Sequence, residues 1–341
     1  MPPILVFILA LTVSAILFWP RTGLLARATR LRRLSERVLV EDVLKHLYDC
    51  EIRGLPGSLE ELAGMLETGR GKAHRILGRA LQMELVTLEQ QGYALTATGR
   101  AYALRVLRTH RLLERFLADR TGLAPDRWHA EAEQREHLLS EAETEKLAHR
   151  MGHPLFDPHG DPIPTATGEM PVASGFPLSR VAPGSFVTVV HLEDEPAEVF
   201  QCLLDAGLAL GQVFQIHEVT RERIAYSVDG QDRSLARALA ANVTVETVSQ
   251  AGASDPRVTT LDTIELGQSA AVVGISPLCH GPQRRRLLDL GVVPGTTIRA
   301  VMRSAGGSPI AYDIRGALIG LRREQAEWIR VRRDQESGAA A

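Results

Sequence analysis

The sequence predicts an α+β protein of several domains: an N-terminal transmembrane helix, a winged helix-turn-helix, a second helical domain and two SH3-like β-barrels. Residues 2–20 form a continuous apolar run, several segments within residues 36–150 show helical periodicity, and the chain beyond residue 176 consists of short β-like runs that occur twice. The chain has 341 residues, 45% of them hydrophobic, which is enough for two or three domain cores. Its net charge of −2 argues against a surface that is basic throughout, so binding to nucleic acid would require a local basic patch.

The N-terminal apolar run, PPILVFILALTVSAILFWP, is long enough to span a bilayer as a helix. Arginines follow the run and no basic side chain precedes it, so the positive-inside rule places the rest of the chain in the cytoplasm. We expect a single-pass anchor at residues 1–20 in the inner (cytoplasmic) membrane and a basic juxtamembrane segment at 21–37, with a cleaved signal peptide as the weaker alternative. The three cysteines form no CxxC pair, which fits a reducing compartment.

The next segment, residues 38–97, predicts a winged helix-turn-helix. An apolar-periodic stretch at 36–50 is followed by the turn RGLPG and by SLEELAGML, which carries the capping-box pair Ser58 and Glu61. A third helix is expected at 68–86, and the runs around the glycine in LVTLEQQGYALT predict a short β-hairpin over 85–96. Three helices and a hairpin in this order are typical of a winged helix.

The third helix of this segment has a basic side that suits a DNA groove. Its apolar members Ile76, Leu77, Ala80 and Leu81 share one face, and no acidic residue occurs before Glu84. A recognition helix would use the exposed side chains for base edges and phosphates, whereas the alternative is a basic, solvated helix. The candidate DNA-binding residues are Arg70, Lys72, His74, Arg75 and Arg79.

The stretch WHAEAEQREH, residues 128–137, concentrates side chains that can bind metals. His129, Glu133, Glu136 and His137 occur at i, i+4, i+7 and i+8, which is one stripe of an α-helix. A helix is also expected at 97–119, where a histidine and a glutamate again lie four residues apart, as His110 and Glu114. The alternative for such a stripe is a solvated helix face.

The remaining chain contains an extended connection and an internal repeat. Residues 153–176 are rich in Pro, Gly and Asp, and LLDAGLALGQVFQI (203–216) parallels LLDLGVVPGTTIRA (287–300). The predicted domains after the winged helix are therefore a helical domain at 98–165, a linker at 166–177 and two β-rich domains at 178–248 and 258–333. We interpret His149, His153 and His159 as surface or linker residues, and the pair Cys279 and His280 as too little for a site.

Several motifs resemble the metal-dependent repressors of the diphtheria toxin repressor family. The motifs are LTATGRA, THRLLERFL, WHAEAEQREHLLS and HPLFDPHGDPIP, and the resemblance covers about residues 38–250. The two C-terminal modules are similar to FeoA-type SH3-like domains, most closely through RRRLLDLGVVPGT. The resemblance implies that residues 98–165 form a metal-binding and dimerisation domain. It implies one metal site from Asp42, Glu133, Glu136 and His137, and a second from His110, Glu114 and His129.

The ion implied is Mn²⁺ or Fe²⁺, because carboxylate and imidazole donors suit both and geometry with supply selects between them. Lys45 stands where the manganese branch has a further carboxylate, which speaks against a bridged manganese pair. Where the iron-sensing branch takes ligands from its SH3-like domain, this chain has Pro196 and Val199. Glu195 and Glu198 are adjacent, so a ligand from the first β-rich domain stays an open question.

The function expected from the resemblance is a metal-dependent DNA-binding transcriptional regulator, a repressor of metal-uptake genes with metal as co-repressor. It would act as a homodimer on a palindromic double-stranded DNA operator. The alternative is a membrane-anchored, metal-sensing adaptor that acts on a ferrous iron transporter through its FeoA-like domains. We do not expect an enzyme, since no HExxH occurs and EQREH has Glu133 in the place of the first histidine of HxxEH.

Overall fold

The computed structural model describes residues 24–90, 92–228, 231–249 and 258–333. The chain divides into two compact units. The first unit contains the described residues up to Thr109 together with Glu136–Glu143 and Pro164–Glu169. The second contains His110–Arg135, Thr144–Ile163 and the described residues from Met170 onward. Each candidate metal cluster described below therefore belongs to a single unit.

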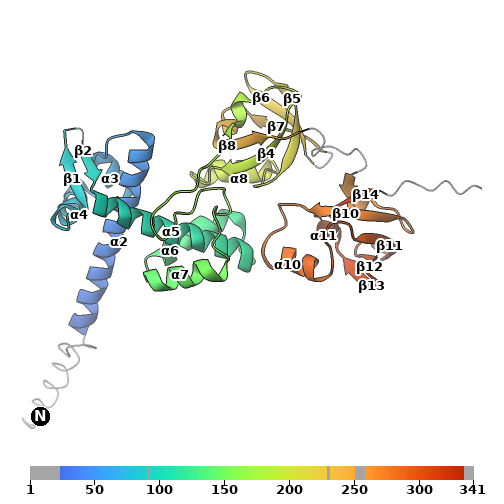
Figure 1. Ribbon diagram of the computed structural model, residues 1–341, viewed down its shortest axis with the longest axis horizontal. Coiled ribbons are helices and arrows are strands. Elements are labelled where there is room, and N and C mark those ends of the chain that lie inside the picture. Colours follow the sequence, from blue (N-terminus) through green and yellow to red (C-terminus); the bar gives the residue numbers. More distant parts are fainter. Residues whose placement is uncertain (1–23, 91, 229–230, 250–257, 334–341) are drawn as a thin grey trace, which may run out of the picture. The chain divides into compact units, whose positions relative to one another are not determined.

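The first unit contains the predicted winged helix (Figure 1). Helices α2 (Leu24–Arg53), α3 (Leu59–Met65) and α4 (Arg70–Gln82) precede the antiparallel hairpin of β1 (Val86–Glu89) and β2 (Gly92–Leu95). The capping box of Ser58 and Glu61 begins α3, as the sequence indicates. Because α2, α4 and the hairpin meet around one buried apolar core, the position of α2 is tied to that of α4. This core contains Val40, Val43, Leu44, Leu47, Leu62, Ile76, Leu77, Ala80, Leu85, Val86 and Ala103.

Three further helices follow the hairpin. They are α5 (Ala97–Arg120), α6 (Trp128–Glu136) and α7 (Glu141–Arg150), with a short 3₁₀ turn at Pro125–Arg127 before α6. The indole Nε1 of the buried Trp128 donates a hydrogen bond to the Leu123 carbonyl at 3.0 Å, which fixes the first turn of α6. The long helix expected at 97–119 and the helix expected over 128–137 are both observed.

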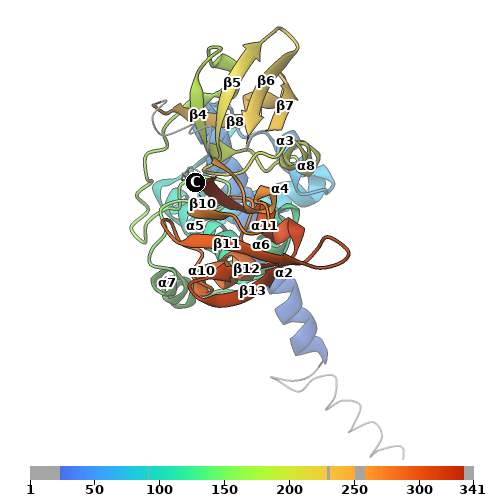
Figure 2. The same cartoon turned by 90° about the vertical axis from the view of Figure 1, so that its right-hand side faces the viewer.

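Each half of the C-terminal region folds as a six-stranded antiparallel sheet with one helix of nine residues. The first sheet has the order β3-β8-β4-β5-β6-β7, and Figure 2 shows β5, β6 and β7 side by side. Its strands are β3 (Phe176–Pro177), β4 (Phe186–Leu192), β5 (Val213–Val219), β6 (Arg223–Val228), β7 (Gln231–Ala236) and β8 (Val243–Thr247), and its helix is α8 (Ala197–Asp205).

The second sheet repeats the first in sequence and in topology. Its order is β9-β14-β10-β11-β12-β13, and its helix α10 (Gly281–Asp289) falls after β10 as α8 falls after β4. Its strands are β9 (Val258–Thr260), β10 (Ser269–Ile275), β11 (Thr297–Arg303), β12 (Ile310–Ile314), β13 (Ala317–Leu321) and β14 (Ile329–Arg333), with α11 (Arg323–Glu327) before the last. Each sheet has its own apolar core. The internal repeat read from the sequence is thus a repeat of architecture.

The fold class and the location predicted from the N-terminus require correction. The anchor expected at residues 1–20 lies outside the described residues, and among those that are described no helix combines the length and apolarity needed to cross a bilayer. The longest of these helices, α2, has 30 residues, but arginines and glutamates recur along its sequence. Charged side chains at that density are too costly to bury in hydrocarbon. This finding contradicts the prediction of a transmembrane element. The inner-membrane location and the membrane partner rested on that element and are wrong with it.

Candidate metal centres

The first candidate centre joins α2 to the C-terminal end of α6. Nε2 of His137 lies 3.3 Å from Oδ1 of Asp42 and 3.4 Å from Oε1 of Glu136. One donor atom of each of these residues lies within 4.8 Å of the others. We call this group the carboxylate cluster. Glu136 is buried, and Asp42 is half-buried, so a hydrated ion could reach the cluster from the side of α2.

The ring of His137 is held from behind by Glu41. Its Nδ1–H donates to Oε2 of Glu41 at 2.6 Å, so Nε2 is the nitrogen that faces Asp42 and Glu136. Burial alone would lower the pKa of His137, but the hydrogen bonds to Asp42 and Glu41 raise it to about 9. A histidine oriented by a carboxylate on its far nitrogen is the usual arrangement around protein-bound metals. The donor set therefore fits a divalent cation.

Two cationic side chains already lie beside the acidic groups that contact His137. Nζ of Lys45 is 2.8 Å from Oε1 of Glu136, and Nε of Arg37 is 2.7 Å from Oε1 of Glu41. Burial would raise the pKa of Glu41, but hydrogen bonds from His137, Tyr102 and Arg37 lower it below its usual value. Lys45, which stands where the manganese branch has a carboxylate, thus balances the negative charge of Glu136.

The second candidate centre, which we call the histidine cluster, lies between α5 and the first turn of α6. Oε1 of Glu114 is 3.1 Å from Nε2 of His110 and 3.1 Å from Nδ1 of His129, and these two nitrogens are 3.3 Å apart. Donors at right angles on one ion, each about 2.1 Å away, lie about 3 Å apart, so the spacing fits one cation. The helical spacing of His110 and Glu114 brings them together as expected.

The histidine cluster gains partners from the first sheet domain. Oδ2 of Asp194, just after β4, lies 3.0 Å from Nδ1 of His129, and Oε1 of Glu195 lies 3.0 Å from its Nε2. Burial would lower the pKa of His129, but hydrogen bonds to Asp194, Glu114 and Glu195 raise it to about 12. As with His137, the nitrogen that points away from the cluster is held by a carboxylate. The sequence alone left open whether this domain contributes to the site.

His159 is a further member of this group: it lies in the extended connection, but its interpretation as a surface residue is wrong. It is 1% exposed, and its Nε2 has no hydrogen-bond partner although it lies 3.7 Å from Oδ2 of Asp194 and 3.9 Å from Oε1 of Glu114. A buried nitrogen without a partner is costly, and a cation shared with the two carboxylates would satisfy it. This unpartnered nitrogen supports the fit of a metal to the histidine cluster.

A tight turn in the extended connection places His159. Oδ1 of Asp157 accepts hydrogen bonds at 2.9 Å from the backbone N–H groups of His159, Gly160 and Asp161. Gly160 has φ +100°, and a Cβ there would lie 2.1 Å from the Val190 carbonyl oxygen, so only glycine fits. The motif DPHGD therefore builds a rigid turn.

Glu133 is the one predicted metal ligand that the structure does not bring into a cluster. Its side chain is exposed on α6, although it shares the helix face of Glu136 and His137. Its role in the carboxylate cluster stays a prediction. The sequence analysis missed three residues of these clusters: Glu41, His159 and Asp194. The Glu-Asp pairs at 41–42 and 193–194 and the motif DPHGD could have indicated them.

The five candidate DNA-binding residues are all exposed. Arg70, Lys72, His74, Arg75 and Arg79 extend along α4, while Ala73, Ile76, Leu77 and Ala80 are buried on its other face. Arg70 also pairs with Glu60 at 3.3 Å. A basic helix with one face fixed in a winged-helix core is the expected form of a recognition helix. Together with the two clusters, it defines the class of winged-helix proteins with candidate metal centres.

Comparisons with known proteins agree with this class. Residues 96–165 match the model described as "Iron dependent repressor, metal binding and dimerisation domain", and residues 176–247 and 259–333 match the FeoA domain. The chain is 32% identical to the iron-dependent repressor IdeR of Mycobacterium leprae over 182 residues, which are 49% of this chain and 79% of the relative. It is 29% identical over 221 residues to the diphtheria toxin repressor of Corynebacterium glutamicum, covering 61% of this chain and 96% of the relative.

Solved structures give the same result. A manganese-dependent transcriptional repressor in complex with manganese superposes with a TM-score of 0.55 at 27% identity, over 61% of this chain and 100% of that one. ScaR with bound Zn²⁺ has a TM-score of 0.51 at 27% identity, over 61% of this chain and 99% of that one. The chain belongs to the family of metal-dependent transcriptional repressors that includes IdeR and the diphtheria toxin repressor. This confirms the family resemblance and the expectation of a regulator rather than an enzyme.

Proposed function

We propose that this chain represses transcription when Mn²⁺ or Fe²⁺ binds at the carboxylate and histidine clusters. The observation that carries the proposal is that Nε2 of His137 contacts both Asp42 on α2 and Glu136 on α6, because α2 also forms part of the core of the winged helix. A divalent cation supplies the positive charge that lets these carboxylates and the imidazole stay together. Asp42, Glu136 and His137 would hold it, and Glu41 would orient the ring of His137.

Coupling to DNA follows from the packing of α2. Val40, Val43, Leu44 and Leu47 of this helix are buried with Ile76 and Leu77 of α4. A change in the position of Asp42 therefore changes the position of the recognition helix as well. Metal and DNA would then favour the same arrangement, which is a shift between pre-existing populations.

The donor types favour Mn²⁺ or Fe²⁺ over softer ions. The two clusters contain carboxylates and imidazoles and no sulfur, and such sites suit both ions. Relatives named for iron and a solved relative that is bound to manganese support the same pair. The ammonium of Lys45 at Glu136 supports one ion at the carboxylate cluster in place of a bridged pair.

The DNA partner would be a palindromic operator bound by a homodimer. The family model that matches residues 96–165 includes dimerisation in its description. A two-fold dimer would place two α4 helices in successive major grooves about 34 Å apart. Arg75→Ala and Arg79→Ala should each weaken DNA binding by about 1–3 kcal/mol and lower the salt dependence, with metal affinity unchanged.

The test is anaerobic capture of genomic DNA fragments by the full chain with Mn²⁺, with Fe²⁺ and with chelator. We expect a palindromic fragment to be enriched only with metal, and the enrichment to be lost in His137→Ala. His153→Ala, which changes an exposed histidine, is the matched control. Enrichment that is equal in chelator, or that persists in His137→Ala, would contradict the proposal.

A further inference from the structure

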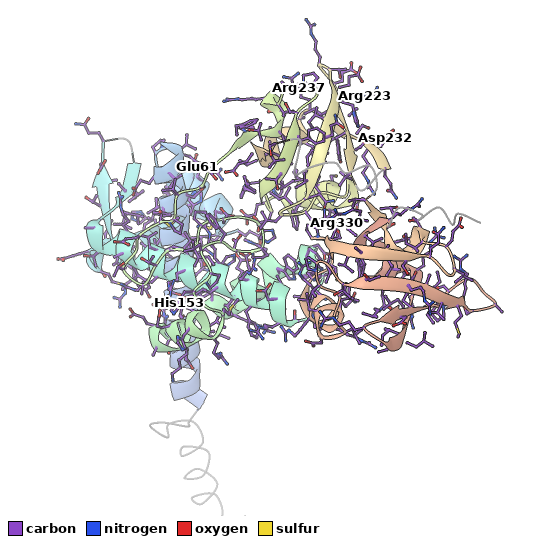
Figure 3. The ribbon with its side chains drawn as sticks, turned by 45° about the vertical axis from the view of Figure 1, so that its right-hand side comes forward. Glu61, His153, Arg223, Asp232, Arg237 and Arg330 are labelled. Carbon is purple, nitrogen blue, oxygen red and sulfur yellow. The ribbon has the colours of Figure 1, made fainter. Side chains whose placement is uncertain are left out.

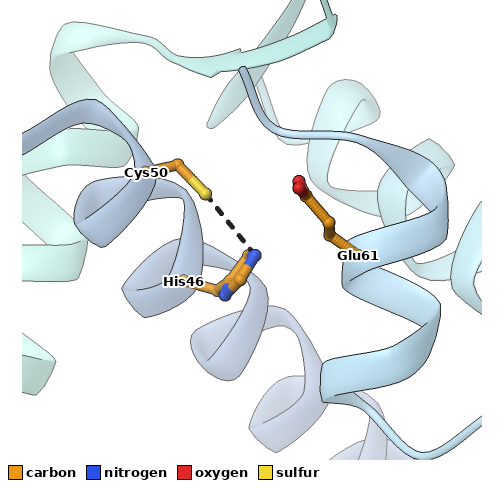
Figure 4. A group of neighbouring side chains, drawn as sticks. All are labelled: His46, Cys50 and Glu61. Atoms are coloured by element: carbon orange, nitrogen blue, oxygen red, sulfur yellow. Dashed lines mark hydrogen bonds between the residues drawn. The ribbon is translucent and has the colours of Figure 1, made fainter. Parts of the chain in front are cut away.

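A third group of metal-binding side chains lies inside the winged helix and shares no residue with the two clusters. It consists of His46 and Cys50 on α2 and Glu61 on α3, and one donor atom of each lies within 4.8 Å of the others. Figure 4 shows the three side chains turned toward the same space, and Figure 3 labels Glu61. The group combines a thiol with an imidazole and a carboxylate, unlike the two clusters of the proposed function.

The spacing of the two α2 side chains matches one tetrahedral ion. Sγ of Cys50 lies 3.5 Å from Nε2 of His46, one helical turn away. With bonds of about 2.3 Å to sulfur and about 2.0–2.1 Å to nitrogen, two ligands of a tetrahedral zinc ion are also about 3.5 Å apart. After loss of the thiol proton to solvent, a cation could therefore replace the present S–H to nitrogen contact without a change in the Sγ to Nε2 distance.

Glu61 is positioned as a third ligand by the capping box of α3. Its Oε2 accepts a hydrogen bond from the Ser58 backbone N–H at 3.3 Å, and its own N–H donates to Oγ of Ser58 at 3.1 Å. These bonds fix the carboxylate at the start of α3. Because Glu61 is exposed while Cys50 is buried, a fourth position would open toward solvent.

The local charge also favours a cation. Burial raises the pKa of the Cys50 thiol, and the nearby carboxylates of Glu61 and Asp49 raise it further. The charge of a cation bound at the sulfur would outweigh both effects, since metal binding removes the thiol proton.

We propose that His46, Cys50 and Glu61 form a zinc-binding site that links α2 to α3 within the winged helix. One thiolate with one imidazole and one carboxylate is a borderline-soft donor set, which suits Zn²⁺ and its spectroscopic substitute Co²⁺. This inference goes beyond the proposed function and does not depend on it. Its consequence is that zinc stabilises the winged helix independently of the metal that acts as co-repressor.

The test uses absorption of Co²⁺, because a cobalt–thiolate charge-transfer band appears only where sulfur binds the ion. The full chain is stripped with chelator under anaerobic conditions with a phosphine reductant and titrated with Co²⁺. We expect one thiolate band that Zn²⁺ removes. The carboxylate and histidine clusters cannot produce it because they contain no sulfur.

Matched variants assign the band. It should be lost in Cys50→Ser and retained in Cys202→Ser, which changes an exposed cysteine of α8. Glu61→Gln keeps a capping-box acceptor but removes the charge, and it should weaken binding at least about tenfold, as should His46→Ala. These two variants decide the question if Cys50→Ser does not fold. No band in the wild type, or a band unchanged in all three site variants, would overturn the proposal.

Discussion

In the carboxylate cluster, Lys45 and Arg37 lie beside the buried acidic groups, whereas in the histidine cluster the positive charge beside Glu114 comes from imidazoles. Both use a histidine whose outer nitrogen is held by a carboxylate, Glu41 for His137 and Glu195 for His129. The difference is that the first has a lysine that competes with an incoming cation, while the second contains a buried nitrogen without a partner. We infer that the histidine cluster is the tighter site and the carboxylate cluster is the one that responds to metal supply.

The largest effect is expected for Glu114→Ala. Oε1 of this buried carboxylate faces nitrogens of His110, His129 and His159, and their charges hold its pKa well below its usual range despite burial. Removing one partner of a buried ion pair costs about 3–5 kcal/mol of folding stability, because the other charge stays buried without compensation. Urea unfolding should show this loss, and metal analysis should show one equivalent fewer, while the exposed Glu141→Ala leaves both unchanged. Wild-type metal content in Glu114→Ala would argue that the histidine cluster holds no ion.

The next effect is expected for Glu41→Gln in the carboxylate cluster. The neutral amide accepts only a weaker hydrogen bond from Nδ1–H of His137 and orients the ring less firmly, so metal affinity should fall about 10–100-fold, as for other residues that orient a ligand. Competition with a chelating dye measures the change, and Glu36→Gln, exposed on the same helix, is the control. An unchanged affinity would show that the hydrogen bond between His137 and Glu41 has no role in metal binding.

Lys45→Gln should remove the difference between the two clusters. Without the ammonium at 2.8 Å from Glu136, the cluster needs a metal to balance its charge, so metal affinity should rise about tenfold, or about 1.4 kcal/mol. Stability in chelator should fall because the buried carboxylate loses its partner. Isothermal titration with Mn²⁺ gives the affinity, with Lys146→Gln as the exposed control. Weaker binding in the variant would mean that Lys45 supports the site.

His159→Phe should give the smallest effect. The phenyl ring keeps the packing against Trp128 and Phe200 but removes the unpartnered nitrogen. Stability in chelator should rise by about 1 kcal/mol, while metal affinity at the histidine cluster falls several-fold because a donor is lost. Thermal unfolding with and without Mn²⁺ compares the two. A fall in stability with unchanged affinity would exclude His159 as a ligand.

The sequence predicted the features that depend on local spacing. The capping box at Ser58, the apolar face of α4 and the i, i+4 pair of His110 and Glu114 need only helical geometry, and all three are observed. The repeat of two sheet domains followed from residues at matching places, such as the LLD-G motifs.

The features that were missed depend on contacts between distant segments. Asp194 and His159 reach the histidine cluster only because the DPHGD turn and the end of β4 lie together. The periodicity of a sequence does not indicate such a contact between distant segments. Glu41 was missed because two adjacent acidic residues of α2 both face His137, one on each ring nitrogen. The transmembrane helix was expected at residues 1–20, outside the described residues, and no described helix is long and apolar enough to cross a bilayer.

The most direct test of the central claim, that metal at these clusters and DNA at α4 favour the same arrangement, is reciprocal titration. The affinity of the full chain for Mn²⁺ is measured with and without the captured DNA fragment, and the affinity for the fragment is measured with and without Mn²⁺. Thermodynamic linkage requires the two ratios to be equal. We predict that both exceed about tenfold in the wild type and approach one in His137→Ala. An Mn²⁺ affinity that is the same with and without DNA would contradict the account.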